Sequence, residues 1–342
     1  MAFAAYLKNR IDITFVKHAS FEQHVVMDDI PHHFFKGKNR FWSVSVKTHL
    51  FIKKLKPDII LVQGFMFPMQ VIFLRLFCGT GFKILIQHHS ELPFGGIKGL
   101  FQKIACGLAN GFVFTAAGDA VLWQNANIIK PGATIFELLE ASTNFTRMDK
   151  QLSKKRTGMS GECNFLWVGR LTEHKDPLTV LNGFEQHLQI NPGAKLYMIY
   201  PTVDLLNEVE QKLNSNQALS KAVKLIGKVP NTEMPYWFSA ADCYVSGSHK
   251  DSTSYALLEA LACGCTPVIT NIPSFKKMTG NGKYGFLYAP GAAGDLARLL
   301  GIIAGTNREK LSNAIIRHFN QNLTTKNIAD DLVNICKNLM AK

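Results

Sequence analysis

The chain has 342 residues, of which 47% are hydrophobic and 18% charged. These values fit a folded protein of about two domains and exclude an intrinsically disordered chain. The formal net charge is +13, and residues 1–160 hold 20 Lys and Arg against 10 Asp and Glu, whereas residues 161–342 hold 18 against 15. A basic N-terminal half indicates an anionic partner, namely a phosphorylated ligand, a lipid headgroup surface or nucleic acid.

Cysteine content and hydropathy predict a reduced, cytoplasmic protein. The seven cysteines form no Cys-x-x-Cys pair and no Cys/His set with metal-ligand spacing, so we expect buried thiols and no metal site. The sequence turns polar after Leu7, which predicts no signal peptide. The most apolar region, 59–77, is interrupted by Gln63, Pro68 and Arg75 and is too broken for a span of about 20 apolar residues. Peripheral attachment at the inner face of the plasma membrane stays open.

Taken in chain order, the first half alternates short β-rich runs with helix-like segments. This alternation is typical of βα units around a parallel sheet. The expected strands are 11–16, 59–62, 83–87 and 111–115, and the expected helices lie near 43–56, 65–77, 97–109 and 118–127.

A basic stretch with Gly and Ser, 147–162, interrupts the alternation and is interpreted as a linker. The alternation then restarts, which predicts a second domain of the same kind. We expect an α/β protein of two doubly wound domains, 1–146 and 163–318, facing a central cleft, with a C-terminal helix in 319–342 that packs back on the first domain. The expected strands of the second domain are 164–168, 195–199, 223–226, 242–245 and 267–270, and its first helices are 177–189, 203–215 and 231–240.

The loop 168–177 follows a buried strand, at the end of the sheet where α/β proteins bind ligands. Asp176 can cap the helix that follows, and Pro177 suits its first position. Arg170 and Lys175 then stand together at the carboxyl end of the strand, where they can neutralise a diphosphate. The alternative interpretation is an ordinary solvated basic loop.

The most informative segment is 248–270, which holds two carboxylates eight positions apart. Asp251 precedes an apolar helix, Glu259 lies inside it, and a strand follows Gly264. A helix N-terminus offers unpaired N–H groups and a positive dipole end, which suit a phosphate. We therefore expect this segment to hold a sugar and a ribose on either side of a diphosphate.

Several motifs in the second half of the chain resemble those of a known family. They are Phe165-Leu-Trp-Val-Gly-Arg-Leu with Lys175-Asp-Pro, Gly227-Lys-Val, Ala240-Ala-Asp-Cys-Tyr-Val-Ser-Gly-Ser248, the pair Asp251 and Glu259, and Gly285-Phe-Leu-Tyr-Ala-Pro-Gly291. With them, the second half resembles the donor-binding domain of retaining glycosyltransferases of family 4, which have the two-domain GT-B fold. The resemblance covers 165–295 and extends more loosely to the first half. It implies a UDP- or GDP-linked sugar as donor substrate and no cofactor.

The resemblance also implies a role for each candidate residue. Glu259 would bind the ribose hydroxyls, and Arg170 and Lys175 would bind the diphosphate. Asp251 would face the transferred hexose as a catalytic residue. The loop of Gly227, Lys228 and Val229 would lie near the base, and Ser252, Thr253, Ser254 and Tyr255 would line the sugar and phosphates.

The chain departs from the family pattern in two places. The family's first acid is usually Glu, whereas Asp251 is shorter by one C–C bond of about 1.5 Å, and Ser252 and Ser254 stand where glycines are usual. These serines can cap the helix. Family members also open with a strand and a Gly-rich turn, whereas this chain starts at what resembles the end of the helix after that turn. Either the start is truncated or mis-assigned, or the first sheet lacks a central strand.

Two adjacent histidines end the buried strand in 83–91. Strand alternation sends them to opposite faces, so only one can point into the cleft. The family places a histidine here, near the sugar and acceptor, and His89 is the first choice for this catalytic role, with His88 second and a purely structural histidine as the alternative. Gln63, Gly64 and Glu91 are candidates for the acceptor side.

Three classes of function follow. The first is a hexosyltransferase that moves a hexose from a nucleotide sugar to a glycan or glycolipid hydroxyl with retention of configuration. No Asp-x-Asp is present, and Arg170 with Lys175 can supply the charge of a metal, so we expect a metal-independent enzyme. The alternative is a degenerate or truncated member that binds nucleotide sugar with little turnover. The third class, nucleic-acid binding, is disfavoured because no recognised nucleic-acid motif accompanies the positive charge. An anionic membrane surface or a polyanionic acceptor explains this charge better.

Overall fold

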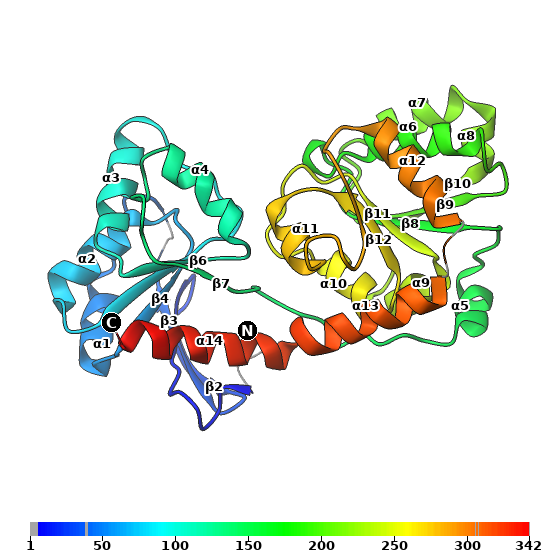
Figure 1. Ribbon diagram of the computed structural model, residues 1–342. Helices are drawn as coiled ribbons and strands as arrows, with labels where there is room; N and C mark the ends of the chain where they lie inside the picture. The colour runs from blue at the N-terminus through cyan, green and yellow to red at the C-terminus, as the bar shows by residue number, and fades with distance from the viewer. Residues whose placement is uncertain (1–5, 38–39, 305, 307, 342) are drawn as a thin grey trace. The chain divides into compact units, whose positions relative to one another are not determined.

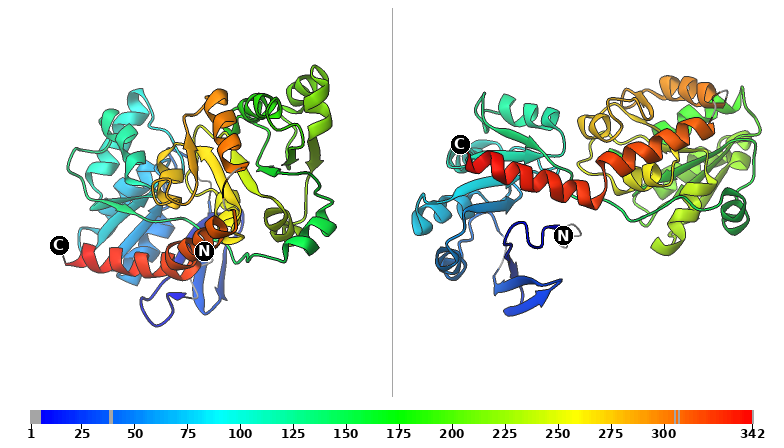
Figure 2. Two further views of the ribbon diagram at one scale, coloured as in Figure 1. Left: turned by 45° about the vertical axis from the view of Figure 1, so that its right-hand side comes forward. Right: turned by 60° about the horizontal axis from the view of Figure 1, so that its bottom comes forward.

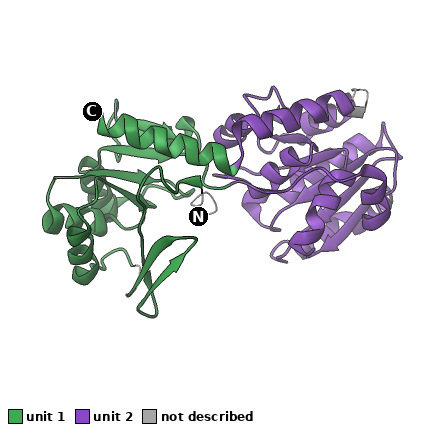
Figure 3. Ribbon diagram, turned by 90° about the horizontal axis from the view of Figure 1, so that it is seen from below, with its two compact units in different colours: residues 1–141, 325–342 green, residues 142–324 purple. Residues whose placement is uncertain are grey.

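The chain folds into two compact units. Unit 1 comprises residues 1–141 and 325–342, and unit 2 comprises residues 142–324 (Figure 3). Each unit is described by itself below. The residues that the computed structural model describes are 6–37, 40–304, 306 and 308–341.

Unit 1 is built around a four-stranded parallel sheet whose strands follow chain order, β4-β5-β6-β7 (Figure 1). The two central strands, β5 and β6, are short apolar runs that are buried on both faces, whereas the edge strands β4 and β7 are half-buried. Phe112, Phe114 and Trp123 lie in its core. The strands are β4 (Ile59–Gln63), β5 (Lys83–Gln87), β6 (Gly111–Phe114) and β7 (Ile135–Glu137), and the helices are α1 (Val46–Leu55), α2 (Pro68–Cys78), α3 (Gly96–Gly107) and α4 (Ala120–Asn125).

A separate three-stranded sheet precedes these elements, in the order β1 (Phe15–Ala19), β3 (Ile30–Lys36) and β2 (Gln23–Met27). The β2–β3 hairpin, which the sequence analysis did not predict, extends from the rest of the unit (Figure 2). Its turn is Asp28-Asp29, both with positive φ, the backbone conformation of a two-residue hairpin turn. Among the described residues, no strand joins β1 to β4, so the strand expected over 11–16 lies as β1 in this separate sheet and not in the sheet of β4.

Unit 2 is built around a six-stranded parallel sheet in the order β10-β9-β8-β11-β12-β13. The five strands predicted here are confirmed, and β13 adds one that was not predicted. Its core contains Phe165, Trp167 and Phe184. The strands are β8 (Asn164–Val168), β9 (Lys195–Ile199), β10 (Val223–Gly227), β11 (Cys243–Ser246), β12 (Thr266–Thr270) and β13 (Phe286–Tyr288). The helices are α5 (Lys150–Thr157), α6 (Pro177–Leu188), α7 (Leu206–Asn214), α8 (Gln217–Ala222), α9 (Met234–Ala240), α10 (Tyr255–Ala262), α11 (Pro273–Met278), α12 (Ala293–Ala304) and α13 (Arg308–Asn322).

The prediction of a linker over 147–162 is wrong, because helix α5 lies within it and packs on α9. Asp149 caps α5 by accepting a hydrogen bond from the Leu152 amide at 2.7 Å. The basic character of the stretch has a structural use, since Arg156 forms two hydrogen bonds with Glu233 at 2.6 and 2.7 Å. A polar, basic composition therefore marked an exposed helix and not a flexible connection.

The last helix, α14 (Thr325–Met340), belongs to unit 1, while α13 belongs to unit 2. Arg10 holds α14 through an ion pair with Asp330, with 2.6 Å between Nη1 and Oδ1. In the described part of the chain, every helix is too short or too polar to cross a lipid bilayer.

Candidate functional site

The candidate site of unit 2 lies where the order of the strands reverses. After β8 the chain adds β9 and β10 on one side, and it then returns to place β11 on the other side of β8. In open α/β sheets, ligands bind beyond the carboxyl ends of the strands at such a point. The loop after β8 carries Arg170 and Lys175, and the loop after β11 carries Asp251. The fold therefore brings the predicted diphosphate and sugar residues to one place.

Lys175 and Asp251 form an ion pair, with 2.5 Å between Nζ and Oδ2. Their side chains are only 18% and 16% exposed, so water screens the pair weakly. Burial, and then the charges of Lys175 and Arg170, lower the pKa of the nearby His174, and Lys250 adds to this effect. Lys175, Arg170 and Lys250 thus place positive charge around the Asp251 carboxylate, an arrangement that attracts an anionic ligand.

The two loops are held together by close backbone contacts. The amide of His249 donates to the carbonyl of His174 at 2.8 Å, and His249 Nε2 lies 2.7 Å from Asp176 Oδ2. A Cβ on Gly247 would lie 2.6 Å from the carbonyl oxygen of Asp176, so only glycine allows this approach. The predicted cap is also confirmed, since Asp176 Oδ1 accepts from the Thr179 amide at 3.0 Å at the start of α6.

Three buried hydroxyl groups hold the loop after β11 by its backbone. Each donates to a different carbonyl oxygen at the end of β11 or in the loop, and each comes from a neighbouring strand or helix. Because the donors sit on β12, β13 and α11, the loop is fixed from several sides. The bonds run from Tyr288 Oη to the Ser246 carbonyl at 2.8 Å, from Thr270 Oγ1 to the Ser248 carbonyl at 2.5 Å, and from Ser274 Oγ to the Asp251 carbonyl at 2.8 Å.

Helix α10 begins at Tyr255, directly after the acid loop. Ser254 occupies its N-cap position but makes no capping hydrogen bond, so the prediction of a serine cap is wrong there. Its hydroxyl instead interacts with that of the buried Tyr244. Neither Ser252 nor Ser254 has a positive φ, so glycine is not required at either position. The first amide groups of α10 therefore keep their capacity to bind an anion.

Glu259 lies within α10, half-buried, one turn beyond the N-terminus of the helix. Burial raises the pKa of Glu259 to about 7. Burial raises the pKa of the nearby Tyr244, and the charges of Asp251 and Glu259 add to this rise. A carboxyl group kept away from water is stabilised by hydroxyl donors, which a ribose can offer.

The predicted base-side loop follows β10, and β9 lies between β10 and β8. Gly227 has a φ of +76°, and its carbonyl accepts from the Tyr200 amide at 3.0 Å. Lys228 is exposed and Val229 is half-buried. These three residues thus lie at the same carboxyl end of the sheet as Arg170 and Lys175, two strands away.

In unit 1, His89 follows β5 and is held by two acceptors. Its Nδ1 lies 2.6 Å from Glu140 Oε2, and its Nε2 lies 2.8 Å from Gln63 Oε1. The hydrogen bond to Glu140 is the main cause that raises the pKa of His89, and the charge of Glu91 adds to it. With an acceptor at each ring nitrogen, the favoured form is the doubly protonated imidazolium.

His88 points into the core of unit 1, as strand alternation predicts. Its ring packs against Phe114, with 4.8 Å between ring centroids, and it is buried. The second choice for the catalytic histidine is therefore a core residue. Glu91 is also structural, because its two carboxylate oxygens accept from the amides of Phe65 at 3.0 Å and His89 at 2.6 Å. This use of both oxygens leaves Gln63 and Gly64 as the acceptor-side candidates at this strand end.

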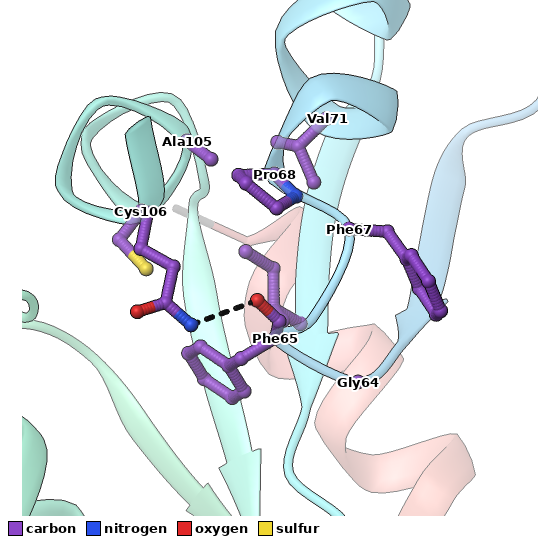
Figure 4. Close-up of a pocket in the computed structure, with 9 residues that line it drawn as sticks. Gly64, Phe65, Phe67, Pro68, Val71, Ala105 and Cys106 are labelled. Atoms are coloured by element: carbon purple, nitrogen blue, oxygen red, sulfur yellow. Dashed lines mark hydrogen bonds between the residues drawn. The ribbon is translucent and has the colours of Figure 1, made fainter. Parts of the chain in front are cut away.

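A small hollow between α2 and α3 is not a ligand site (Figure 4). Phe65, Pro68 and Val71 line it, and Gln102 donates a hydrogen bond across it to the Phe65 carbonyl at 3.0 Å. It has room for about one water molecule.

Four site residues were missed by sequence reasoning. All lie at or shortly after the carboxyl end of a strand, which is the signal that could have found them. Tyr288 and Thr270 lie inside segments already singled out, but their roles could not be read there, because each of the four residues acts through a contact with a residue far away in the sequence. They are Glu140 after β7, Thr270 at the end of β12, Ser274 after β12 and Tyr288 at the end of β13.

Comparison with solved structures defines the class of the fold. Sucrose-phosphate synthase from Thermosynechococcus elongatus has a TM-score of 0.73 at 15% identity, covering 98% of this chain and 91% of that one. Anabaena HepE in complex with UDP has a TM-score of 0.72 at 15% identity, covering 92% and 87%. With its two Rossmann-like units, the chain has the GT-B fold.

The family follows from the sequence. Residues 149–321, just over half of the chain, match the family model of glycosyl transferases group 1, and the chain belongs to this family. D-inositol 3-phosphate glycosyltransferase from Thermomonospora curvata is 22% identical over 205 residues, 57% of this chain and 47% of the relative. Alpha-monoglucosyldiacylglycerol synthase from Streptococcus pneumoniae is 27% identical over 140 residues, 41% of this chain and 31% of the relative. The chain thus spans less than half the length of these curated relatives.

Proposed function

We propose that this protein transfers a hexose from a nucleoside-diphosphate sugar to a hydroxyl acceptor with retention of configuration. The observation that carries the proposal is the arrangement at the switch point of unit 2, where Lys175 pairs with Asp251 at 2.5 Å and α10 begins directly behind them. Family membership supports the same activity.

The three parts of the donor's nucleotide are each proposed to bind a different set of residues. The diphosphate lies between the amides at the start of α10 and the cations Arg170 and Lys175, since both attract negative charge. The ribose hydroxyls donate to Glu259, and the base lies toward Gly227 and its loop. Similar solved structures contain UDP, which makes a uridine donor the first to test, with guanosine second.

The leaving group gains negative charge as the bond to the hexose breaks. Lys175, which is largely buried, and Arg170, which is exposed, stabilise this charge, and the effect of Lys175 is the larger because water screens it weakly. We infer that these two residues take the place of a required divalent metal and that no cofactor takes part. Asp251 faces the hexose, and its carboxylate is held in place by the hydroxyl of Ser274 through the backbone.

Unit 1 is proposed to bind the acceptor, with His89 as its catalytic residue. Because His89 favours the imidazolium form, it acts as a hydrogen-bond donor and a positive charge and not as a general base. The names of the relatives suggest inositol phosphates and diacylglycerol lipids as acceptor classes.

The test combines donor binding with turnover. Thermal shifts with UDP-glucose, GDP-mannose and ADP-glucose identify the donor, and release of the nucleoside diphosphate is then measured with an inositol phosphate or a diacylglycerol lipid. Proton NMR of the product reports the anomeric configuration. We expect one donor to stabilise the wild type and not Glu259→Ala. Donor binding without transfer to any acceptor would contradict the proposal and favour a protein that only binds nucleotide sugar.

A further inference from the structure

Helix α3 of unit 1 carries two apolar faces. One contains Ala105 and Cys106 and packs into the core. The other contains Ile97, Leu100 and Ile104, whose side chains are 66%, 55% and 43% exposed. Their spacing of three and four residues places them in one stripe. A surface helix normally exposes polar residues to water, so this apolar stripe indicates a surface that binds a partner.

Aromatic residues extend the stripe. Trp42 is 51% exposed and meets the ring of Phe101 edge-on, with 5.1 Å between ring centroids. Phe101 follows Leu100 on α3, between Ile97 and Ile104 in the stripe. The α3 face is defined here as Trp42, Ile97, Leu100, Phe101 and Ile104. Tryptophan beside exposed aliphatic side chains is typical of surfaces that meet the boundary between water and lipid.

The charge around the α3 face is positive. Lys98 and Lys103 are both exposed, and α3 has no acidic residue. Residues 30–118 contain 11 Lys and Arg but only two acids. One of these acids, Glu91, is already engaged by the backbone amides described above. Lysine stems lie along apolar surface while their ammonium groups reach outward, as Lys98 does 5.7 Å above the ring of Phe41.

A recess at the C-terminal end of α3 is also positively charged. It is lined by Lys103 and Lys130 together with Asn110 and Thr134. Cations and hydrogen-bond donors thus border the C-terminal end of the apolar stripe. A phosphate-bearing headgroup fits such a border, because it accepts hydrogen bonds and carries negative charge.

We propose that the α3 face docks on an anionic lipid bilayer, with the apolar stripe in the headgroup and acyl boundary and the lysines at the phosphates. A second copy of the chain fits less well, because lysines would face lysines. Single-stranded nucleic acid also fits less well, because it stacks on aromatic planes and not on an Ile/Leu stripe. This assigns a partner that the donor site does not need, so it goes beyond the proposed function.

The docking surface adjoins the acceptor side of unit 1. Helix α3 begins at Gly96, seven residues after His89 and on the same connection from β5. Contact of α3 with a bilayer therefore brings the carboxyl end of β5 close to the lipid surface, where a lipid-linked acceptor would be found.

The test is co-sedimentation of the full chain with vesicles of phosphatidylcholine alone or with 30% phosphatidylglycerol, about a third of the lipid, as an anionic surface. We expect the wild type to bind the anionic vesicles at least about tenfold better, and less at high salt. Ile97→Ser/Leu100→Ser should lose most of this binding. The matched control is Ile190→Ser/Ile302→Ser in unit 2, whose side chains are 77% and 44% exposed and which should bind as the wild type does.

Two further variants separate the parts of the α3 face. Lys98→Gln/Lys103→Gln should reduce the preference for anionic over neutral vesicles and leave the melting temperature unchanged. Vesicles with brominated lipid should quench tryptophan fluorescence in the wild type and not in Trp42→Phe. Equal sedimentation of the wild type and Ile97→Ser/Leu100→Ser would overturn the proposal. So would a dimer, seen by light scattering, that only this variant disrupts, because a second copy would then cover the face.

Discussion

Lys175 and Asp251 neutralise each other across the two loops of the unit 2 site, with 2.5 Å between Nζ and Oδ2. In the proposed complex the diphosphate competes with Asp251 for the same ammonium group. The carboxylate of Asp251 therefore weakens binding of the nucleotide, although it is proposed to act on the transferred hexose as a catalytic residue. This conflict leads to opposite effects on binding and on turnover.

We expect Asp251→Asn to bind UDP about three to tenfold more tightly than the wild type, because a like charge is removed and Lys175 is released. Turnover should fall by about 100-fold or more, since the catalytic carboxylate is lost. Lys175→Ala should weaken UDP binding and turnover together. Calorimetry with UDP and a transfer assay measure both quantities, and weaker UDP binding by Asp251→Asn would show that the acid does not compete.

Gly247→Ala tests the close approach of the two loops. Its Cβ would lie 2.6 Å from the carbonyl of Asp176 and 3.3 Å from that of Lys175, so the loops must separate. We expect a loss of about 1–3 kcal/mol in the free energy of unfolding and weaker donor binding. Gly301→Ala is the control, because nothing lies within 4 Å of its added Cβ within α12. That control should fold normally and bind donor as the wild type does.

The hydroxyl of Thr270 holds the buried carbonyl of Ser248. Thr270→Val keeps the shape and removes the donor, which should cost about 1–3 kcal/mol and raise KM for the donor. Thr270→Ser keeps the donor and should restore KM. The control is Ser153→Ala, which removes a buried hydroxyl of α5 that donates to the Asp149 carbonyl at 2.6 Å. This variant should lower stability and leave KM unchanged. An unchanged KM in Thr270→Val would rule out a positioning role.

Glu259 makes stability depend on pH. Burial raises its pKa to about 7 in the folded chain, above the ordinary value of 4.5. The folded state then binds the proton more tightly than the unfolded state, so stability falls as the pH rises from 4.5 through 7. Glu259→Gln should therefore be more stable than the wild type at pH 8, by about 1–2 kcal/mol after allowance for partial exposure, and equal to it below pH 5. Urea unfolding at both pH values measures this, and donor binding should be lost in the same variant.

His89 should make stability depend on pH in the same sense as Glu259, because its pKa is also raised in the folded chain. The hydrogen bond to Glu140 raises its pKa, so its contribution to stability is complete below the unfolded pKa and disappears as the pH rises through the folded pKa. Glu140→Gln should lower the pKa of His89, which NMR of the imidazole protons can follow. His318 in unit 2 serves as an internal reference, because its pKa should not respond to the change.

Much of the fold was accessible from local patterns. Alternating strands and helices predicted β4, β5 and β6 of unit 1 and five of the six strands in the sheet of unit 2, because each βα unit is specified by its own periodicity. The short edge strands β7 and β13 were not predicted. The β2–β3 hairpin was missed because β2 is mostly exposed and β3 is largely half-buried, so neither strand shows a clear apolar pattern. Helix α5 was mistaken for a linker because its basic residues pair with Asp242 and Glu233, which lie far along the chain. Patterns within a window cannot show such pairs.

For the candidate site, too, some features follow from the sequence and others only from the tertiary structure. By itself the sequence selected Arg170, Lys175, Asp251 and Glu259 as candidates and determined the helix start between the two acids, because these residues lie in contiguous motifs with a fixed spacing. Only the tertiary structure decided that Lys175 is paired with Asp251, that His88 is buried while His89 meets Glu140, and that an apolar stripe on α3 is exposed. Each depends on which strands become neighbours and which helix face meets the core, and these are properties of the whole chain and not of any one segment.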